Sequence, residues 1–493
     1  MPRECYSIVE YFAEREKHKC GYCKAVNTNL NYGMWAHYLT VQNYQDLIDR
    51  GWRRSGSYLY KPVMDQICCP MYTIRCDAPN FNISKSQKKI LKRMAKFLHN
   101  ELKNESMDTS DIVKLDGRLD TSGIEISNYI KPANQVQKNI EKFSITTAES
   151  ELERRLSPQP MCSKLKKSTE VTSSEGSLTI SNITPESGKH PVKKAKQLRF
   201  ERKLKKLAAQ GKSVKEIEDI TKQTLQARVN IKSLEELFDE VHVGSNRLEM
   251  KLVRVMSEEF LNTLDVTVNL YKEYQMAIHG DPPEKCDKKT FFNFLVKSPL
   301  QHWNPKDGPP KGYGSFHEQY WLDNRLIAVG VIDILPLCIS SVYFFYDPKL
   351  HSLSLGTFSS LREVYLTRQL NKISSNLKFY YMGFYIHTCP KMRYKAKIRP
   401  SKLLCPETYV WCDIEKCLPK LDKQKYCRLN EDIDGIDETG IVNIQKVSVL
   451  YRETIMLYPS YSQRSKVKDE DEVREYAALV GMKCAQSLLL YRS

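Results

Sequence analysis

The sequence lacks a hydrophobic run long enough to cross a bilayer. Its most apolar stretch, 326–341, is interrupted by Asp333 and Pro336, and a spanning helix needs about 20 apolar residues. The first residues, 1–6, are polar and charged and lack the apolar segment of a signal peptide. We therefore expect a soluble intracellular protein without a membrane partner, in which cysteine thiols stay reduced.

Several catalytic signatures are also missing. Neither H-E-x-x-H nor G-x-S-x-G occurs, which argues against a zinc-protease helix and a serine-hydrolase elbow. Gly211-Lys-Ser213 resembles the end of a P-loop, but Lys206 stands where the first glycine of that motif would be. We see no internal repeat. The sequence therefore predicts no phosphate cradle and no hydrolase of these kinds.

Acidic residues are too few to balance the basic ones. The 493 residues include 76 Lys and Arg against 59 Asp and Glu, a net charge of +17. An excess of this size favours a polyanionic partner, and nucleic acid comes first because nothing anchors the chain to a membrane. A hydrophobic content of 41% and an aromatic content of 10% indicate globular lobes with real cores.

Composition divides the chain into segments. Residues 104–190 are rich in Ser, Thr, Asn, Glu and Lys, which is typical of a disordered linker. In 193–206, eight of fourteen residues are cationic; as a helix this stretch would bind phosphates, signal nuclear import or simply be solvated. The predicted segments are an N-terminal Cys-rich lobe at 1–103, the linker at 104–190, a basic helical segment at 191–245, a second lobe at 246–420 and a strand–helix extension at 421–493.

Hydrophobic periodicity predicts mixed α and β structure in both lobes. Expected helices begin after Thr40, at Ser86, near Leu270, at Thr357 and after Asp469. Expected strands are 57–60, 71–75, 326–335, 340–346, 379–386 and 446–457. The order strand, strand, helix, strand over 326–386 is that of the second half of a GNAT-like acyltransferase. We predict an α/β, GNAT-like fold split by a long linker, with an N-terminal Cys-rich lobe.

The helix expected at 86–101 is amphipathic and basic. Apolar residues lie on one face, and the other carries Lys88, Lys89, Lys92, Arg93 and Lys96. The pattern fits either a solvated face or a surface that contacts RNA.

Four cysteines near the start form the sharpest local pattern. Cys20 and Cys23 are a C-x-x-C pair, whose sulfurs can turn toward one point. Cys68 and Cys69 are adjacent, so both serve one site only if the chain turns there, and Pro70 makes that turn reasonable. These four predict a metal or cluster site; the alternative is a set of small buried hydrophobes. The later cysteines are irregularly spaced and are interpreted as structural.

The chain resembles the eukaryotic arginyl-tRNA–protein transferases. The residues that carry the resemblance lie in both lobes and cover about half the chain. They include Cys20-Gly-Tyr-Cys23, Gly51-Trp-Arg-Arg-Ser-Gly56, Cys68-Cys69-Pro70, Tyr313-Gly-Ser-Phe-His317, Ile327-Ala-Val-Gly-Val-Ile-Asp-Ile-Leu-Pro336, Leu361-Arg-Glu363, Tyr381-Met-Gly-Phe-Tyr-Ile-His387 and Cys389-Pro-Lys-Met-Arg-Tyr-Lys395.

The resemblance implies transfer of arginine from arginyl-tRNA to the N-terminal α-amine of proteins that begin with Asp, Glu or oxidised Cys. That transfer marks them for ubiquitin-dependent degradation through the arginine N-degron pathway. It also implies a GNAT-like fold, a cytoplasmic and nuclear location, and an iron–sulfur cluster at Cys20, Cys23, Cys68 and Cys69, with zinc as the alternative.

Such a reaction is the aminolysis of an ester, and it needs an acidic surface for the arginyl group, a basic pocket for the acceptor and a proton carrier. For the acidic surface we favour Asp333, because a carboxylate inside an apolar strand needs a partner, and then Glu363. His317 and His387 are candidate proton carriers, and Tyr381 is a candidate for orienting the amine. Each could instead be a structural residue.

For the acceptor pocket we predict basic side chains, because arginine forks match carboxylates. The candidates are Arg53 and Arg54 beside Ser55, with Lys391 and Arg393. Each of the basic four could equally contact tRNA phosphate or be solvated.

Two other classes of protein stay open. Charge and cysteines alone would fit a non-catalytic thiol–metal RNA-binding adaptor. A CoA-dependent N-acetyltransferase would need a glycine-rich turn before the helix at 357–370, and this chain has only Gly356 there. That single glycine disfavours the acetyltransferase.

Overall fold

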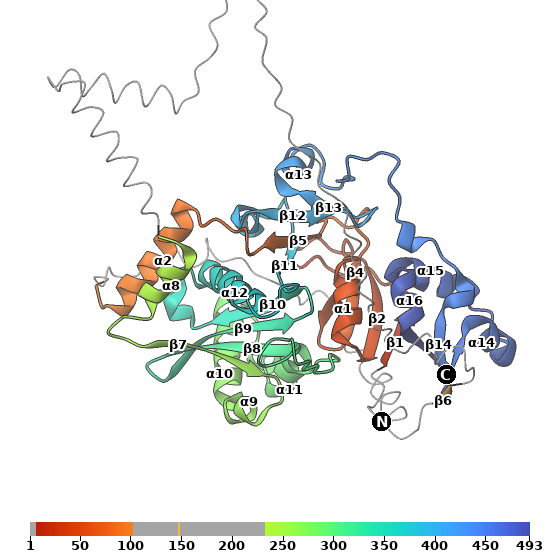
Figure 1. The fold of residues 1–493 in the computed structure, drawn as a ribbon, viewed down its shortest axis with the longest axis horizontal. Helices are drawn as coiled ribbons and strands as arrows, with labels where there is room; N and C mark the ends of the chain where they lie inside the picture. Colours follow the sequence, from red (N-terminus) through yellow and green to blue (C-terminus); the bar gives the residue numbers. More distant parts are fainter. Residues whose placement is uncertain (1–5, 102–145, 148–231) are drawn as a thin grey trace, which may run out of the picture. The chain divides into compact units, whose positions relative to one another are not determined.

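The computed structural model describes residues 6–101, 146–147 and 232–493 (Figure 1). The predicted linker at 104–190, apart from two residues, and the basic stretch at 193–206 lie outside the described residues. The described residues before 156 and after 234 form one compact unit.

Two eight-stranded sheets organise this unit. In the first, the strand order is β3-β4-β2-β1-β16-β14-β15-β6. Its strands are β1 (Ser7–Phe12), β2 (Asn31–Tyr38), β3 (Arg53–Ser55), β4 (Tyr58–Pro62), β6 (Thr146–Thr147), β14 (Ser448–Tyr451), β15 (Thr454–Leu457) and β16 (Leu488–Arg492). β1 is antiparallel to β2 and parallel to β16, where Ser7 is opposite Leu488. The sheet therefore joins strands from the two ends of the described chain.

The second sheet has the order β13-β12-β5-β11-β10-β9-β8-β7. Its strands are β5 (Tyr72–Asp77), β7 (Leu248–Arg254), β8 (Gly314–Leu322), β9 (Arg325–Ile334), β10 (Cys338–Tyr346), β11 (Phe379–Tyr385), β12 (Ser401–Leu404) and β13 (Trp411–Asp413). Its neighbours are antiparallel except β10 and β11, which run parallel. β5 comes from the first hundred residues and lies between β11 and β12, so the sheets cut across the segment boundaries drawn from composition.

Helices cover these sheets. They are α1 (Val41–Ile48), α2 (Lys85–Leu98), α8 (Leu234–Val241), α9 (Glu258–Asn262), α10 (Leu264–Tyr274), α11 (Lys288–Phe291), α12 (Leu355–Asn371), α13 (Ile414–Leu421), α14 (Tyr458–Ser465), α15 (Glu470–Val480) and α16 (Met482–Ser487). α12 packs on β10 and β11, and α10 packs on β9 and β10; Figure 1 shows α12 above and α10 below this part of the sheet.

Local sequence chemistry explains where the early helices start. Thr40 caps α1, because its hydroxyl accepts the backbone N–H of Asn43. α2 begins with a capping box in which the Ser84 side chain accepts the N–H of Gln87 and the Gln87 side chain returns to Ser84. Gly51, at φ 84°, follows the end of α1.

The α/β class is confirmed, and the predicted strands at 326–335, 340–346 and 379–386 correspond to β9, β10 and β11. The prediction of one strand over 446–457 is wrong, because the chain reverses at Arg452 (φ 47°) and forms the β14–β15 hairpin. In the part of the chain that the structure describes, no helix is both long and apolar enough to span a membrane.

Candidate active site and thiolate site

A cavity opens where β10 and β11 separate. The two strands pair only from Cys338 opposite Phe379 to Ser340 opposite Tyr381. After that, the register of β10 shifts on its β9 side, and Gly383 in β11 takes φ 65°, a conformation that suits glycine. The space between them is a cavity of about 380 Å³. Its charged and hydroxyl-bearing wall residues include Arg53, Arg54, Ser340, Ser341, His351, Ser359, Ser360, Glu363, Lys391 and Lys395.

Glu363 reaches this cavity from α12 while remaining 1% exposed. Its Oε1 accepts a hydrogen bond of 2.9 Å from the Ser359 hydroxyl, one turn earlier on the helix. Its Oε2 is buried and has no hydrogen-bond partner in the described parts of the chain. Burial, with the nearby Glu318 charge adding to it, raises the pKa of Glu363 to about 7. A buried acceptor without a partner is costly. Small shifts would let Oε2 accept from the nearby Tyr380 or Ser341 hydroxyl, or from a ligand in the cavity.

Arg53, in β3, supplies the opposite charge. Its Nη1 donates to the backbone oxygens of Trp52 at 2.7 Å and Ile48 at 3.3 Å. Its Nε and Nη2 are buried and have no hydrogen-bond partner among the residues described. These two nitrogens form one edge of the guanidinium, the edge that can bind both oxygens of a carboxylate. The orientation of Arg53 therefore leaves a two-point anion site in the cavity wall.

Lys395 is a further ionisable group in the wall, and no sequence pattern singled it out. Its Nζ donates to the backbone oxygens of Met382 and Phe384, both at 2.7 Å. Those residues flank Gly383, so the lysine braces β11 where it separates from β10. Burial, with the nearby Arg53 charge, lowers the pKa of Lys395 to about 7. The only sequence signal was its place at the end of the block 389–395.

Asp333 and Arg54, predicted for different substrate surfaces, bind each other. Arg54 Nε lies 2.7 Å from Asp333 Oδ2, and Nη2 lies 2.6 Å from Oδ1. The Ser315 hydroxyl also donates to Oδ1 at 2.7 Å. The Asp333 side chain is fully buried, and both of its oxygens have protein donors.

The two predicted histidines lie outside the cavity wall. His317, on β8, is fully buried with Nε2 3.1 Å from the backbone oxygen of Leu295, and burial lowers its pKa to about 4. His387 has Nδ1 2.8 Å from the Tyr385 hydroxyl and Nε2 2.8 Å from Asp422 Oδ1. The structure does not bring either histidine to Glu363.

Of the remaining predicted residues, one lines the cavity and the others do not. Lys391 lines the cavity. Tyr381 is fully buried and donates its hydroxyl to Asp49. Ser55 is buried in β3 opposite Tyr58, and Arg393 is exposed with Nε donating to the backbone oxygen of His387. Of the predicted site residues, the structure therefore gathers Arg53, Arg54, Glu363 and Lys391 around one space.

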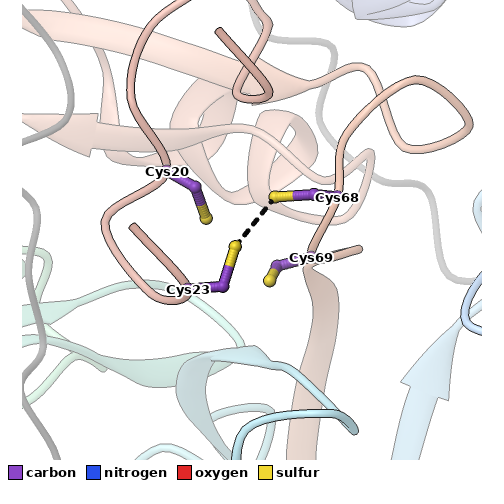
Figure 2. A group of neighbouring side chains, drawn as sticks. All are labelled: Cys20, Cys23, Cys68 and Cys69. Atoms are coloured by element: carbon purple, nitrogen blue, oxygen red, sulfur yellow. Dashed lines mark hydrogen bonds between the residues drawn. The ribbon is translucent and has the colours of Figure 1, made fainter. Parts of the chain in front are cut away.

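The four N-terminal cysteines converge. Figure 2 shows Cys20 and Cys23 on one loop and Cys68 and Cys69 on another, with their sulfurs facing a common point. All four Sγ atoms lie within 4.8 Å of one another, and those of Cys23 and Cys68 are 3.3 Å apart. Thr28 Oγ1 also donates to Cys68 Sγ at 3.0 Å. The chain turns at Cys68-Cys69, as it must if both adjacent cysteines are to face one site.

The spacing of these sulfurs fits a metal bound by four thiolates. A tetrahedral ion with bonds of about 2.3 Å places its sulfurs about 3.8 Å apart, which this set can adopt with small shifts. Cys20 and Cys69 are buried while Cys23 is exposed, so the site lies at the surface of its small apolar cluster. The residues could hold one ion, and the donor set suits zinc or iron.

Comparison with known proteins adds independent information. A family model described as "Arginine-tRNA-protein transferase, N terminus" matches 18–89, and one described as "Arginine-tRNA-protein transferase, C terminus" matches 266–405. The first range contains all four clustered cysteines and Arg53; the second contains Glu363 and Lys395. The two models therefore cover the residues that form the thiolate cluster and the cavity.

Several curated proteins are similar to this chain. "Arginyl-tRNA--protein transferase 1" of Drosophila melanogaster is 42% identical over 98% of this chain and 99% of its own length. "Arginyl-tRNA--protein transferase 2" of Arabidopsis thaliana is 36% identical over 84% of this chain and 76% of its own. An "Aspartate/glutamate leucyltransferase" of Pseudomonas putida is 34% identical over 29% of this chain and 53% of its own.

The chain has an α/β fold and a cavity lined by one acid and several basic side chains. It is similar over nearly its whole length to such proteins and falls in the class of tRNA–protein transferases. Within that class, it belongs to the arginine-tRNA–protein transferase family.

Proposed function

We propose that this protein transfers the arginyl group of arginyl-tRNA to the N-terminal α-amine of proteins that begin with Asp, Glu or oxidised Cys, and so marks them for ubiquitin-dependent degradation. One observation carries the proposal: an acid with an unpartnered oxygen, Glu363, and a guanidinium with an unpartnered edge, Arg53, line the same cavity. The reaction joins a basic acyl group to an acidic acceptor, and the cavity offers the complementary charge for each.

Glu363 is the residue we propose for the arginyl side chain. Its ionised carboxylate would accept hydrogen bonds from the substrate guanidinium, and the incoming positive charge would lower the raised pKa of Glu363. The earlier candidate, Asp333, is less suited because Arg54 and Ser315 already occupy both of its oxygens. We therefore propose Asp333 as a positioning residue that fixes Arg54 beside the cavity.

Arg53 is the residue we propose for the acceptor. Its free edge would bind the two oxygens of an Asp or Glu carboxylate or of a cysteine sulfinate. Lys391, in the same wall, would add positive charge. An amide side chain offers a single acceptor oxygen and no charge, so the site should discriminate Asp from Asn.

The chemistry is the aminolysis of an ester. The neutral α-amine forms a C–N bond to the arginyl carbonyl carbon, the C–O bond to the terminal ribose breaks, and the amine proton ends on the ribose oxygen. We propose the Lys395 Nζ as the carrier of that proton, because its lowered pKa leaves much of it neutral at pH 7 and it lines the cavity. Positioning of both substrates in one cavity would supply much of the remaining acceleration.

The proposed fold within this class is GNAT-like. Support comes from the order β9, β10, α12, β11 and from the parallel pair β10–β11 that separates around the cavity. A CoA donor is disfavoured because the first turn of α12 offers one glycine, Gly356, for binding a pyrophosphate. The charges of Glu363 and Arg53 in the cavity favour arginyl-tRNA as the co-substrate.

For the thiolate site we propose a single tetrahedral ion, with zinc favoured over an iron–sulfur cluster. The sulfurs lie within 4.8 Å of one another, closer than the corners of a cubane cluster would hold them. A bound ion would brace the loops at Cys20 and at Cys68, and the latter leads into β5. We also propose a cytoplasmic and nuclear location, on the family resemblance alone; imaging of a tagged protein would test it.

Incubation of the pure protein with labelled arginyl-tRNA and an Asp-starting peptide tests the function. We expect label in the peptide, and none in an otherwise identical Asn-starting peptide. The absence of transfer under both aerobic and anaerobic conditions would overturn the proposal. Label from acetyl-CoA would support an N-acetyltransferase, and tRNA binding without any transfer would support an RNA-binding adaptor.

A further inference from the structure

Helix α2 carries its positive charge on a single surface. The side chains that it buries are Gln87, Leu91, Met94 and Leu98. Its exposed cations are Lys85, Lys89, Lys92, Arg93 and Lys96. At about 100° per residue, these five fall on the side opposite the buried stripe. We call them the α2 cationic face.

Among the residues that the structure describes, acidic groups leave most of this face unpaired. Lys85, Lys89, Lys92 and Lys96 make no ion pair with any residue of the described chain. At one edge, burial and the charge of Lys92 lower the pKa of Lys88, although Glu236 of the neighbouring α8 acts in the opposite direction. Lys88 and Lys92 therefore repel each other, and an anion placed along the helix would relieve that repulsion.

The other edge of the face touches the border of the cavity. Arg93 Nη1 donates to the backbone oxygen of Ser352 at 2.8 Å. Ser352 belongs to the short helix η5 (Pro348–Leu353), and its neighbours His351 and Ser354 line the cavity. α2 also packs against α12, whose first turn contributes Gly356 to the cavity wall. Figure 1 shows α2 and α8 beside α12.

We propose that the α2 cationic face binds the backbone phosphates of the acceptor end of the donor tRNA and leads its aminoacylated 3′ end across η5 into the cavity. This proposal rests on the proposed function. From Lys85 to Lys96 the helix extends about 16 Å, a length over which a nucleic-acid duplex carries on the order of ten phosphate charges. A row of five cations on a rigid helix matches one edge of such a duplex.

Contacts of this kind position a nucleic acid without reading its sequence. The α2 face would therefore bind every arginine-accepting tRNA alike, and also uncharged tRNA. Discrimination of the acyl group would be left to Glu363 in the cavity. Binding of the tRNA backbone and recognition of the acyl group would thus be separate tasks. The role of α2 can therefore be tested by tRNA binding alone, without transfer activity.

The test compares two triple variants of the full chain. K89A/K92A/K96A removes three cations from the α2 face. K446A/R464A/K468A removes three exposed cations from the short helix η9 (Ile444–Lys446), α14 and the turn after it, and serves as the matched control. The measurement is the affinity for uncharged tRNA over a range of salt concentrations, with thermal unfolding to confirm that each variant folds.

We expect the α2 variant to bind tRNA about tenfold or more weakly at about 0.15 M salt, and its slope of log K against log salt to fall by about two to three. The control should stay within about twofold of the starting protein. In transfer assays, KM for arginyl-tRNA should rise while kcat and KM for the peptide change little. K89R/K92R/K96R, which keeps the charge, should bind tRNA normally.

An α2 variant with unchanged affinity and slope would overturn the inference, as would an equal loss in the control. Lost binding to vesicles that contain phosphatidylserine, with tRNA binding retained, would also overturn it and assign the face to lipid phosphate. A starting protein that binds tRNA through α2 but transfers no arginine would refute the proposed function and leave this inference standing.

Discussion

Arg54 and Asp333 form a two-point ion pair, with Nε–Oδ2 at 2.7 Å and Nη2–Oδ1 at 2.6 Å. Arg54 belongs to β3 of the first sheet and Asp333 to β9 of the second. The side chains are 1% and 0% exposed. The pair therefore ties the two sheets together beside the cavity.

Breaking this pair on one side should destabilise the protein strongly. In Arg54→Met, the Asp333 carboxylate loses its partner, and we expect a loss of about 3–5 kcal/mol in the free energy of unfolding. The double variant R54M/D333L, which removes both charges, should recover much of that loss. Denaturant titration checks both. A well-folded Asp333→Asn protein that has lost transfer would instead support a direct role for Asp333.

Glu363→Gln should abolish efficient use of arginyl-tRNA and yet stabilise the fold at neutral pH. The folded pKa of about 7 exceeds the ordinary 4.5, so the stability that Glu363 contributes is complete below pH 4.5 and declines as pH rises through 7. Gln avoids this loss, worth about 3 kcal/mol at pH 8 and under about 1 kcal/mol at pH 5. Unfolding curves at the two pH values measure it. A variant that is less stable at both pH values would contradict a buried carboxylate with a raised pKa.

Arg53→Ala should weaken the acceptor step selectively. Loss of a bidentate, charge-assisted contact corresponds to about 10- to 100-fold in kcat/KM for an Asp-starting peptide. KM for arginyl-tRNA should change little, and the preference for Asp over Asn should shrink. Arg53→Lys keeps the charge without the fork and should recover only part of the activity. An equal loss of tRNA affinity would reassign Arg53 to phosphate binding.

Lys395→Arg tests proton transfer, because arginine stays protonated. We expect kcat to fall by about 10²–10⁴ while both KM values change little. The kcat of Lys395→Met should fall by a similar factor, and addition of a small primary amine should restore peptide labelling. A variant whose loss lies wholly in KM, or that no amine rescues, would leave Lys395 only its role of bracing β11 through Met382 and Phe384.

Cys23→Ser should lower the bound metal and loosen the N-terminal loops without removing the cavity. We expect about one metal ion per chain in the starting protein, no visible absorption band, and a lower melting temperature for the variant. Metal analysis and an optical spectrum of anaerobically prepared protein provide the readout. A strong visible spectrum with several iron atoms per chain would favour the iron–sulfur alternative.

The sequence predicted the elements whose signals are local. Thr40 marks the start of α1, α2 begins at Lys85, one residue before the predicted Ser86, and the apolar runs of β9 and β10 are continuous. The thiolate cluster was also predictable, because the four cysteines are a rare residue type in a recognisable spacing.

Local sequence patterns could not predict which strands pair or which charged residues bind each other over long sequence separations. No local pattern shows that β5 inserts between β11 and β12, or that Arg54 and Asp333, 279 residues apart, satisfy each other. Hydrogen-bond partners also bear on the choice between the two predicted acids, which stays a prediction. An acid in an apolar strand attracted attention to Asp333, whereas Glu363, on an ordinary helical repeat, is the one with an unpartnered oxygen.

The parallel pairing of β1 with β16 has a consequence for biosynthesis. Ser7 leaves the ribosome hundreds of residues before Leu488, its neighbour in the sheet. Until then, β1 has one uncovered edge, and the apolar side chains of Val9 and Tyr11 lack part of their core. A nascent chain of this protein must shelter that edge from other strands for most of its synthesis, which makes it a candidate client for chaperones that act at the ribosome.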